Sequence, residues 1–159
     1  MNITNESMTE GRRGIVVGYD GSAVSAAALD WAAAEAERRH LVLTVLLAVE
    51  DSVSQTSSHA ARLGLGEDRA HRCAAESVRR ARSSASSVAI VVETHFGTPS
   101  HALIQKSLQA DLVVLGVSGR NRPADGAAGP VALAVSAQAH CPVMVVGPDH
   151  VRQYPGVSQ

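Results

Sequence analysis

A glycine-dense stretch, running from Gly116 to Pro130, is the part of this sequence whose residue types and spacing best suit ligand binding. It follows a short aliphatic run and leads directly into an Ala- and Val-rich segment with helical character. Glycine allows a backbone to approach a ligand closely, and a helix N-terminus offers free N–H groups to a phosphate. Arg120 and Arg122 would add positive charge. A surface loop with solvated arginines explains the same residues equally well.

A second candidate follows the first aliphatic run, where the sequence reads Tyr19-Asp20-Gly21-Ser22. Asp20 could act as a base or hold a metal ion, but forming a turn suits its position better. Ser22 suits a helix N-cap, because its hydroxyl can accept from the first free backbone N–H groups. Ligands of open α/β sheets bind beyond the carboxyl ends of the strands, where strand order reverses, and both candidates follow strand-like runs.

Other familiar motifs are absent from the sequence. A P-loop needs a Gly-Lys pair, and neither that pair nor G-x-G-x-x-G after a strand occurs. The segment from Gly116 to Gly119 is one residue short of a G-x-S-x-G nucleophile elbow, so Ser118 is interpreted as a turn residue. The seven histidines lack metal-ligand spacing, and no residue set predicts a catalytic or metal centre.

Short aliphatic runs alternate with longer Ala-rich segments along the chain. The runs are continuously apolar, which predicts strands buried on both faces and linked by helices in a doubly wound parallel α/β sheet. Thr98-Pro99 and Gly129-Pro130 resemble helix starts with Pro in the first turn. The predicted strands are 14–18, 41–49, 88–94, 112–115 and 143–146. The predicted helices are 22–40, 67–85, 100–110 and 131–140, the second with five arginines on a solvated face.

The totals indicate one cytoplasmic domain over residues 13–147. We expect flexible segments at 1–12 and 148–159, and a flexible Ser-rich loop at 50–66. The formal net charge of −1 gives no reason to expect a nucleic acid, and no apolar run is long enough to cross a bilayer. The start of the chain lacks the apolar core of a signal peptide. Two cysteines in unrelated contexts fit a reducing compartment.

Three stretches together resemble the universal stress proteins, in particular the kind common in actinobacteria. IVVGYDGSAVSAAALDWAAAEA is similar to the family's first strand, Asp-Gly-Ser turn and first helix. FGTPSHALIQKSLQADLVVLG is similar to its third helix and fourth strand, and GVSGRNRPADGAAGPVALAVSAQAHCPVMVV to its glycine loop and closing strand. The resemblance covers most of residues 14–147, whereas 50–85 agrees only in general character.

The resemblance implies a five-stranded parallel sheet of order 3-2-1-4-5 and a Rossmann-like fold. The family's ATP-binding branch carries G-x2-G-x9-G-[ST], and the three glycines of that pattern are present here. By resemblance, Asp20 would contact the adenosine, Val49 would meet adenine through its backbone, and Leu115 and Gly116 would pack near the ribose. The backbone N–H groups expected to hold phosphates are those of Gly119, Gly129 and Val131.

Pro130 departs from the pattern, because it stands where the branch has Ser or Thr. Proline has neither an N–H group nor a hydroxyl, although it suits the first turn of a helix. Losing one hydrogen bond to a charged phosphate would weaken binding by roughly 10- to 150-fold. We therefore expect ATP or another adenine nucleotide as ligand, with Mg²⁺ as a candidate companion ion.

Three functions remain open at this point. The first is a nucleotide-binding regulator of stress response or dormancy that acts through conformation and protein partners. The second is a dimeric interaction module with a disabled pocket, and the third is weak ATP hydrolysis or phosphotransfer. The family implies a homodimer in which Val143–Val146 pairs with its own copy, the alternative being an edge covered by the C-terminal tail.

Overall fold

A computed structural model describes residues 13–49, 59–118, 128–147, 151–154 and 156. For 59–67 and 151–154 the description is confined to the backbone. Several expectations fall outside the described residues. They are those for 1–12, for Gly119, Arg120 and Arg122, and for most of the C-terminal segment 148–159.

Six strands form one sheet in the order β3-β2-β1-β4-β5-β6. In chain order the strands are β1 (Ile15–Gly18), β2 (Leu43–Val49), β3 (Ile90–Phe96), β4 (Leu112–Gly116), β5 (Val143–Val146) and β6 (Val151–Tyr154). The first five are parallel to one another, which confirms the predicted order 3-2-1-4-5 and the Rossmann-like α/β fold.

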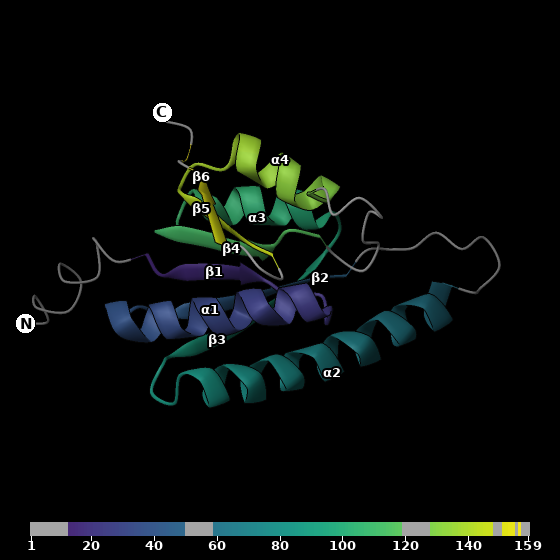
Figure 1. Cartoon of the computed structure of the whole chain (residues 1–159). Coiled ribbons are helices and arrows are strands. Elements are labelled where there is room, and N and C mark those ends of the chain that lie inside the picture. Colours follow the sequence, from purple (N-terminus) through teal and green to yellow (C-terminus); the bar gives the residue numbers. More distant parts are fainter. Residues whose placement is uncertain (1–12, 50–58, 119–127, 148–150, 155, 157–159) are drawn as a thin grey trace, which may run out of the picture.

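Four helices cover the two faces of the sheet (Figure 1). The helices are α1 (Ala23–Arg39), α2 (His59–Ser84), α3 (Pro99–Ser107) and α4 (Pro130–Gln138). Figure 1 shows α1 and α2 on one face and α3 and α4 on the other. Each connection between consecutive parallel strands is therefore a helical crossover, as parallel pairing requires.

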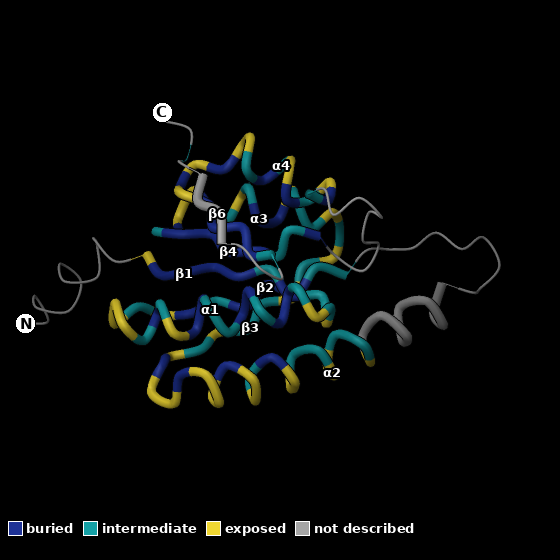
Figure 2. The backbone as a smooth tube through the Cα atoms, in the orientation of Figure 1, coloured by how far each residue is buried: buried dark blue, intermediate teal, exposed yellow. Residues whose placement is uncertain are grey.

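Successive residues of the central strands face opposite helix layers. In β1, Ile15 and Val17 join the core beneath α1 and α2, whereas Val16 joins the core beneath α3 and α4. In β4, Val114 joins the core beneath α1 and α2, and Val113 joins the core beneath α3 and α4. Burial on both faces explains why these strands are continuously apolar, and Figure 2 shows them as the dark interior of the molecule.

A sixth strand, β6, pairs antiparallel with β5 and covers its outer edge. Its register places Val143 opposite Tyr154 and Val146 opposite Val151. The expectation of a flexible tail over residues 148–159 is therefore wrong for Val151–Tyr154. It also occupies the edge through which a second copy was expected to pair, and matches the alternative in which the tail covers this edge.

The helix boundaries differ from expectation mainly in α2. This helix begins at His59, inside the segment expected to be a loop, instead of at Glu67. The start of α1 agrees with expectation, because the Ser22 side chain accepts from the backbone N–H of Ser25 at 3.2 Å. Thr98 does occupy the cap position of α3, but its hydroxyl makes no capping hydrogen bond.

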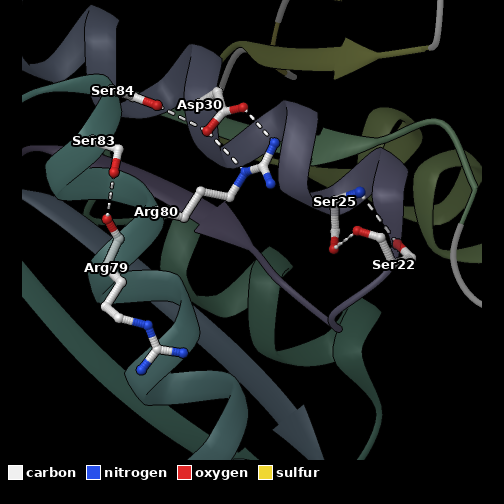
Figure 3. A network of polar contacts seen from close by, with 7 residues as sticks. All are labelled: Ser22, Ser25, Asp30, Arg79, Arg80, Ser83 and Ser84. Atoms are coloured by element: carbon white, nitrogen blue, oxygen red, sulfur yellow. Dashed lines mark hydrogen bonds and ion pairs between the residues drawn. The ribbon is translucent and has the colours of Figure 1, made fainter.

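Arginines of α2 attach this helix to its neighbours, although four of the five are exposed, as expected for a solvated face. Arg80 binds both carboxylate oxygens of Asp30 in α1, at 2.9 and 2.7 Å, and Ser84 donates to the same carboxylate (Figure 3). Arg82 donates to the carbonyl oxygen of Val88. The contacts of Arg80 and Ser84 hold α2 against α1 alongside the apolar packing beneath both helices.

Candidate functional site

The carboxyl ends of β1 and β4 lie side by side in the middle of the sheet. Ile15 is paired with Leu112 and Val17 with Val114. From β1 the chain continues into α1 and then to β2 on one side, whereas β5 follows β4 on the other side. Strand order therefore reverses between β1 and β4, the place where ligands of such sheets bind.

Asp20 forms a turn directly after β1. Its Oδ1 accepts from the backbone N–H of Ser22 at 2.9 Å, and its own N–H donates to Ser25 Oγ at 3.3 Å. Gly21 between them has a φ of +84°, a conformation that glycine adopts without strain. The turn role expected for Asp20 is thus present, and it fixes the carboxylate beside the N-terminus of α1.

Helix α2 packs against the turn that follows β1. Arg69 donates from its guanidinium to the carbonyl oxygen of Asp20 at 3.2 Å. A Cβ placed on Gly21 would lie 3.5 Å from Cys73 Sγ, so this half-buried thiol packs against the turn. Sequence reasoning missed both residues, because a helical pattern does not tell which loop an arginine or cysteine will meet.

Tyr19 is buried under the same helix, with 3% of its surface exposed. Its hydroxyl makes no hydrogen bond of ordinary geometry with the described residues. Burial, and after it the nearby Glu76 carboxylate, raise the pKa of Tyr19. The phenol is therefore neutral throughout the physiological range.

Gly116 ends β4 in close contact with the start of α1. A Cβ at this position would lie 2.7 Å from Val24 Cγ1 and 3.2 Å from the backbone nitrogen of Ser25. Only glycine lets the two segments approach this closely. The preceding Leu115 is buried in the core beneath α3 and α4, so only its backbone is available at the strand end.

The N-terminus of α4 follows from the same strand end. Gly129 is its N-cap and donates its own N–H to the Val117 carbonyl at 2.7 Å. Pro130 occupies the first turn and is exposed. Because proline has no N–H, the donors left at this helix end are those of Val131 and Ala132.

Ser118 lies against this helix end. A Cβ on Gly129 would sit 3.4 Å from Ser118 Cα and 3.8 Å from its Cβ. The serine is 5% exposed, and its Oγ has no hydrogen-bond partner in the described part of the chain. The role expected for Ser118 is that of a turn residue, and its spacing in the sequence does not predict a buried, unpaired hydroxyl.

Val49 ends β2 on the same side of the sheet as Asp20 and Gly116. The N–H of Tyr19 donates to the Leu46 carbonyl at 3.0 Å, which fixes β2 beside the start of the turn. The Val49 carbonyl accepts from the backbone N–H of Gly97 at 3.0 Å. Because a carbonyl oxygen has two lone pairs, it can accept a second hydrogen bond. The expected site residues that the structure describes therefore lie together at the carboxyl ends of the parallel strands.

The described residues contain no cluster of His, Cys, Asp and Glu able to hold a metal ion. None of their helices has the length and apolarity that a bilayer crossing requires. What the edge does offer is one carboxylate, backbone N–H groups at a helix end and a buried hydroxyl. The N–H groups and the hydroxyl can donate to an anion, whereas the carboxylate can accept from hydroxyl groups of a ligand.

Comparison with known sequences agrees with the fold. The model of the Universal stress protein family matches residues 11–147. A universal stress protein of Mycobacterium tuberculosis is 33% identical over 144 residues, which cover 87% of this chain and 49% of the relative. Another from the same organism is 32% identical over 136 residues, with 86% and 49% covered. The chain spans about half the length of these curated relatives.

Solved structures with the same architecture include the universal stress protein UspA from Lactobacillus plantarum. Its TM-score is 0.71 at 28% identity, and the match covers 85% of this chain and 98% of that one. A universal stress protein in complex with cAMP has a TM-score of 0.63 at 25% identity, covering 83% and 94%.

Proposed function

We propose that this chain, which belongs to the universal stress protein family, is an adenine-nucleotide-binding regulator that acts through its bound state rather than through turnover. The observation that carries the proposal is the convergence of Asp20, Val49, Gly116 and the α4 N-terminus at the point where strand order reverses. The structure of the family member with cAMP, at 25% identity, supports an adenine nucleotide as ligand.

In this proposal each group at the carboxyl ends of the strands contacts a different part of the nucleotide. The backbone of Val49 meets adenine, the Asp20 carboxylate meets the adenosine moiety, and the backbone at Leu115 and Gly116 borders the ribose. Phosphate lies at the N-terminus of α4, where Val131 offers an N–H and the helix dipole favours negative charge. The N–H of Gly129 is already bonded to the Val117 carbonyl, so this glycine contributes by letting the phosphate approach the backbone closely.

Pro130 shapes the preference among nucleotides. It removes one N–H group and one hydroxyl from the phosphate end and leaves the adenine and ribose contacts unchanged. We propose that the chain distinguishes ATP from AMP or cyclic AMP less strongly than a protein with Ser at this position. Hydrolysis is slow at best, because the edge lacks a lysine to stabilise charge on a transferred phosphoryl group.

A second candidate function is an interaction module that binds no nucleotide. The observation favouring it is Pro130 itself, which weakens the phosphate end. The proposed homodimer through Val143–Val146 has an added requirement, because β6 occupies that edge of β5. Pairing of two copies along β5 requires release of β6 from the sheet.

Isothermal titration with adenosine, AMP, cyclic AMP, ADP and ATP tests the proposal, with Pro130→Ser measured in parallel. Micromolar binding of at least one nucleotide by the parent supports the regulator. A Pro130→Ser variant that gains roughly 10- to 150-fold in ATP affinity identifies the phosphate end. If the parent binds nothing and only the variant binds ATP, the interaction module is the better function.

A further inference from the structure

We propose that the Ser118 hydroxyl replaces the hydroxyl missing at Pro130 and donates to a phosphate oxygen of the bound nucleotide. The inference rests on the proposed function, because it names a further residue of the same site. It makes Ser118 a determinant of preference for phosphorylated ligands over adenosine.

The first observation is the state of the hydroxyl itself. Ser118 is 5% exposed, and no group in the described part of the chain accepts from or donates to its Oγ. Buried polar atoms in native proteins are nearly always hydrogen-bonded, since leaving one unpaired costs stability. By contrast, the buried hydroxyls of Ser77 and Ser107 each donate to a nearby helix carbonyl, at 2.8 and 2.5 Å. The hydroxyl of Ser118 therefore has hydrogen-bonding capacity that no described residue uses.

The second observation is its position at the start of α4. The Cα and Cβ of Ser118 lie 3.4 and 3.8 Å from the place a Gly129 side chain would occupy. Ser118 therefore lies directly against the N-cap of α4, in the space next to the glycine. The residue after that cap is Pro130, where the family pattern would supply a hydroxyl.

The third observation concerns what this helix end lacks. Its N-cap glycine has no side chain to cap the helix, and its first turn contains a proline without an N–H. The N–H of Gly129 is committed to the Val117 carbonyl. A phosphate here has the N–H groups of Val131 and Ala132, and one further donor from Ser118 would complete a set of three.

The experiment compares Ser118→Ala with the parent by titration of adenosine, AMP and ATP. We expect affinity for ATP and AMP to fall by about 10- to 150-fold and affinity for adenosine to change by less than about twofold. Ser136→Ala, in the last part of α4, is the matched control and is expected to bind all three ligands as the parent does. Thermal unfolding without ligand is expected to be unchanged or shifted upward in Ser118→Ala, because the substitution removes an unpaired hydroxyl.

A rescue separates ligand contact from a structural role. Pro130→Ser introduced into Ser118→Ala is expected to restore most of the lost ATP affinity, since it returns a hydroxyl to the same helix end. Equal ATP affinity in Ser118→Ala and the parent overturns the inference and leaves the proposed function standing. Lowered thermal stability with equal loss of adenosine and ATP binding also overturns it, as does failure of the rescue. A parent that binds no adenine ligand overturns the inference and the proposed function together.

Discussion

The guanidinium of Arg69 lies 3.2 Å from the carbonyl oxygen of Asp20 and so joins helix α2 to the turn that follows β1. The contact gives α2 a route to influence the candidate site without touching a ligand. A change in the position of α2 would move the Asp20 backbone directly.

Replacing Arg69 by Ala tests this connection. Because Arg69 is partly solvated, its hydrogen bond contributes about 1 kcal/mol to holding the turn, so nucleotide binding should weaken by at most roughly fivefold. Titration of AMP measures the loss. Arg72 is exposed and lies one turn further along α2, so Arg72→Ala is the matched control and is expected to bind like the parent. Equal affinity in both variants would show that the turn holds its shape without α2.

Gly116 and Gly129 have different structural requirements although both belong to the same motif. Gly116→Ala places a Cβ 2.7 Å from Val24 Cγ1 and 3.1 Å from the Val24 backbone carbon. We expect a loss of about 1–3 kcal/mol in the free energy of unfolding, measured by urea denaturation. Gly129→Ala meets its nearest atom at 3.4 Å, an ordinary contact, and should cost under about 1 kcal/mol. Similar losses in the two variants would contradict the close approach at Gly116.

The association of β6 with β5 depends on a second glycine contact. Gly156 lies so close to Cys141 that an added Cβ would be 2.5 Å from its carbonyl carbon and 2.6 Å from its oxygen. We expect Gly156→Ala to release β6 and to speed amide exchange in Val143–Val146, because the backbone atoms of Cys141 have little room to move. Exposure of the β5 edge should also increase self-association in sedimentation equilibrium. Unchanged exchange in this strand would show that β6 holds without the glycine.

The two cysteines should differ in reactivity and in their effect at alkaline pH. Burial raises the pKa of the Cys141 thiol from 9.0 to about 11. The unfolded chain therefore loses this proton first, and stability should be constant below about pH 9 and fall by up to about 2–3 kcal/mol as the pH rises to 11. Urea denaturation across this range should show a shallower decline in Cys141→Ala. A decline of the same slope in the variant would assign it to other groups, of which Tyr19 is the first to examine.

Thiol labelling offers an independent check on the same residues. Cys73 is half-buried beside the Asp20 turn, whereas Cys141 is 6% exposed. At pH 8 we expect a thiol reagent to modify Cys73 in the folded protein and to modify Cys141 only after unfolding. Labelling of both at similar rates would contradict the burial of Cys141.

The central parallel strands were predictable because they are buried on both faces and are therefore almost continuously apolar, whereas β3 at the end of the sheet is partly exposed. β6 was not predictable, since the segment Val151–Tyr154 is short, carries Arg and Gln at its centre and depends on β5 for its pairing. The early start of α2 at His59 was missed for a related reason, because Ser and Gly in 50–66 favour a loop reading locally.

The loops that form the candidate site were predictable from the sequence. The positions of Asp20 and Gly116 follow from their place after buried strands together with the order of the sheet. The contacts of Arg69 and the burial of Ser118 depend on how distant segments pack, and a helical or loop pattern does not encode that. Pro130 is the reverse case, because its chemical consequence follows directly from its identity.

Backbone amide NMR during titration with AMP tests the central claim most directly, because it reports both binding and its location. We predict saturable shifts at Asp20, Val49, Gly116 and Val131, all at the carboxyl edge of β1, β2 and β4, with little change at the opposite end of the sheet. Shifts confined to other parts of the chain, or none at millimolar AMP and ATP, would contradict a nucleotide site at this edge.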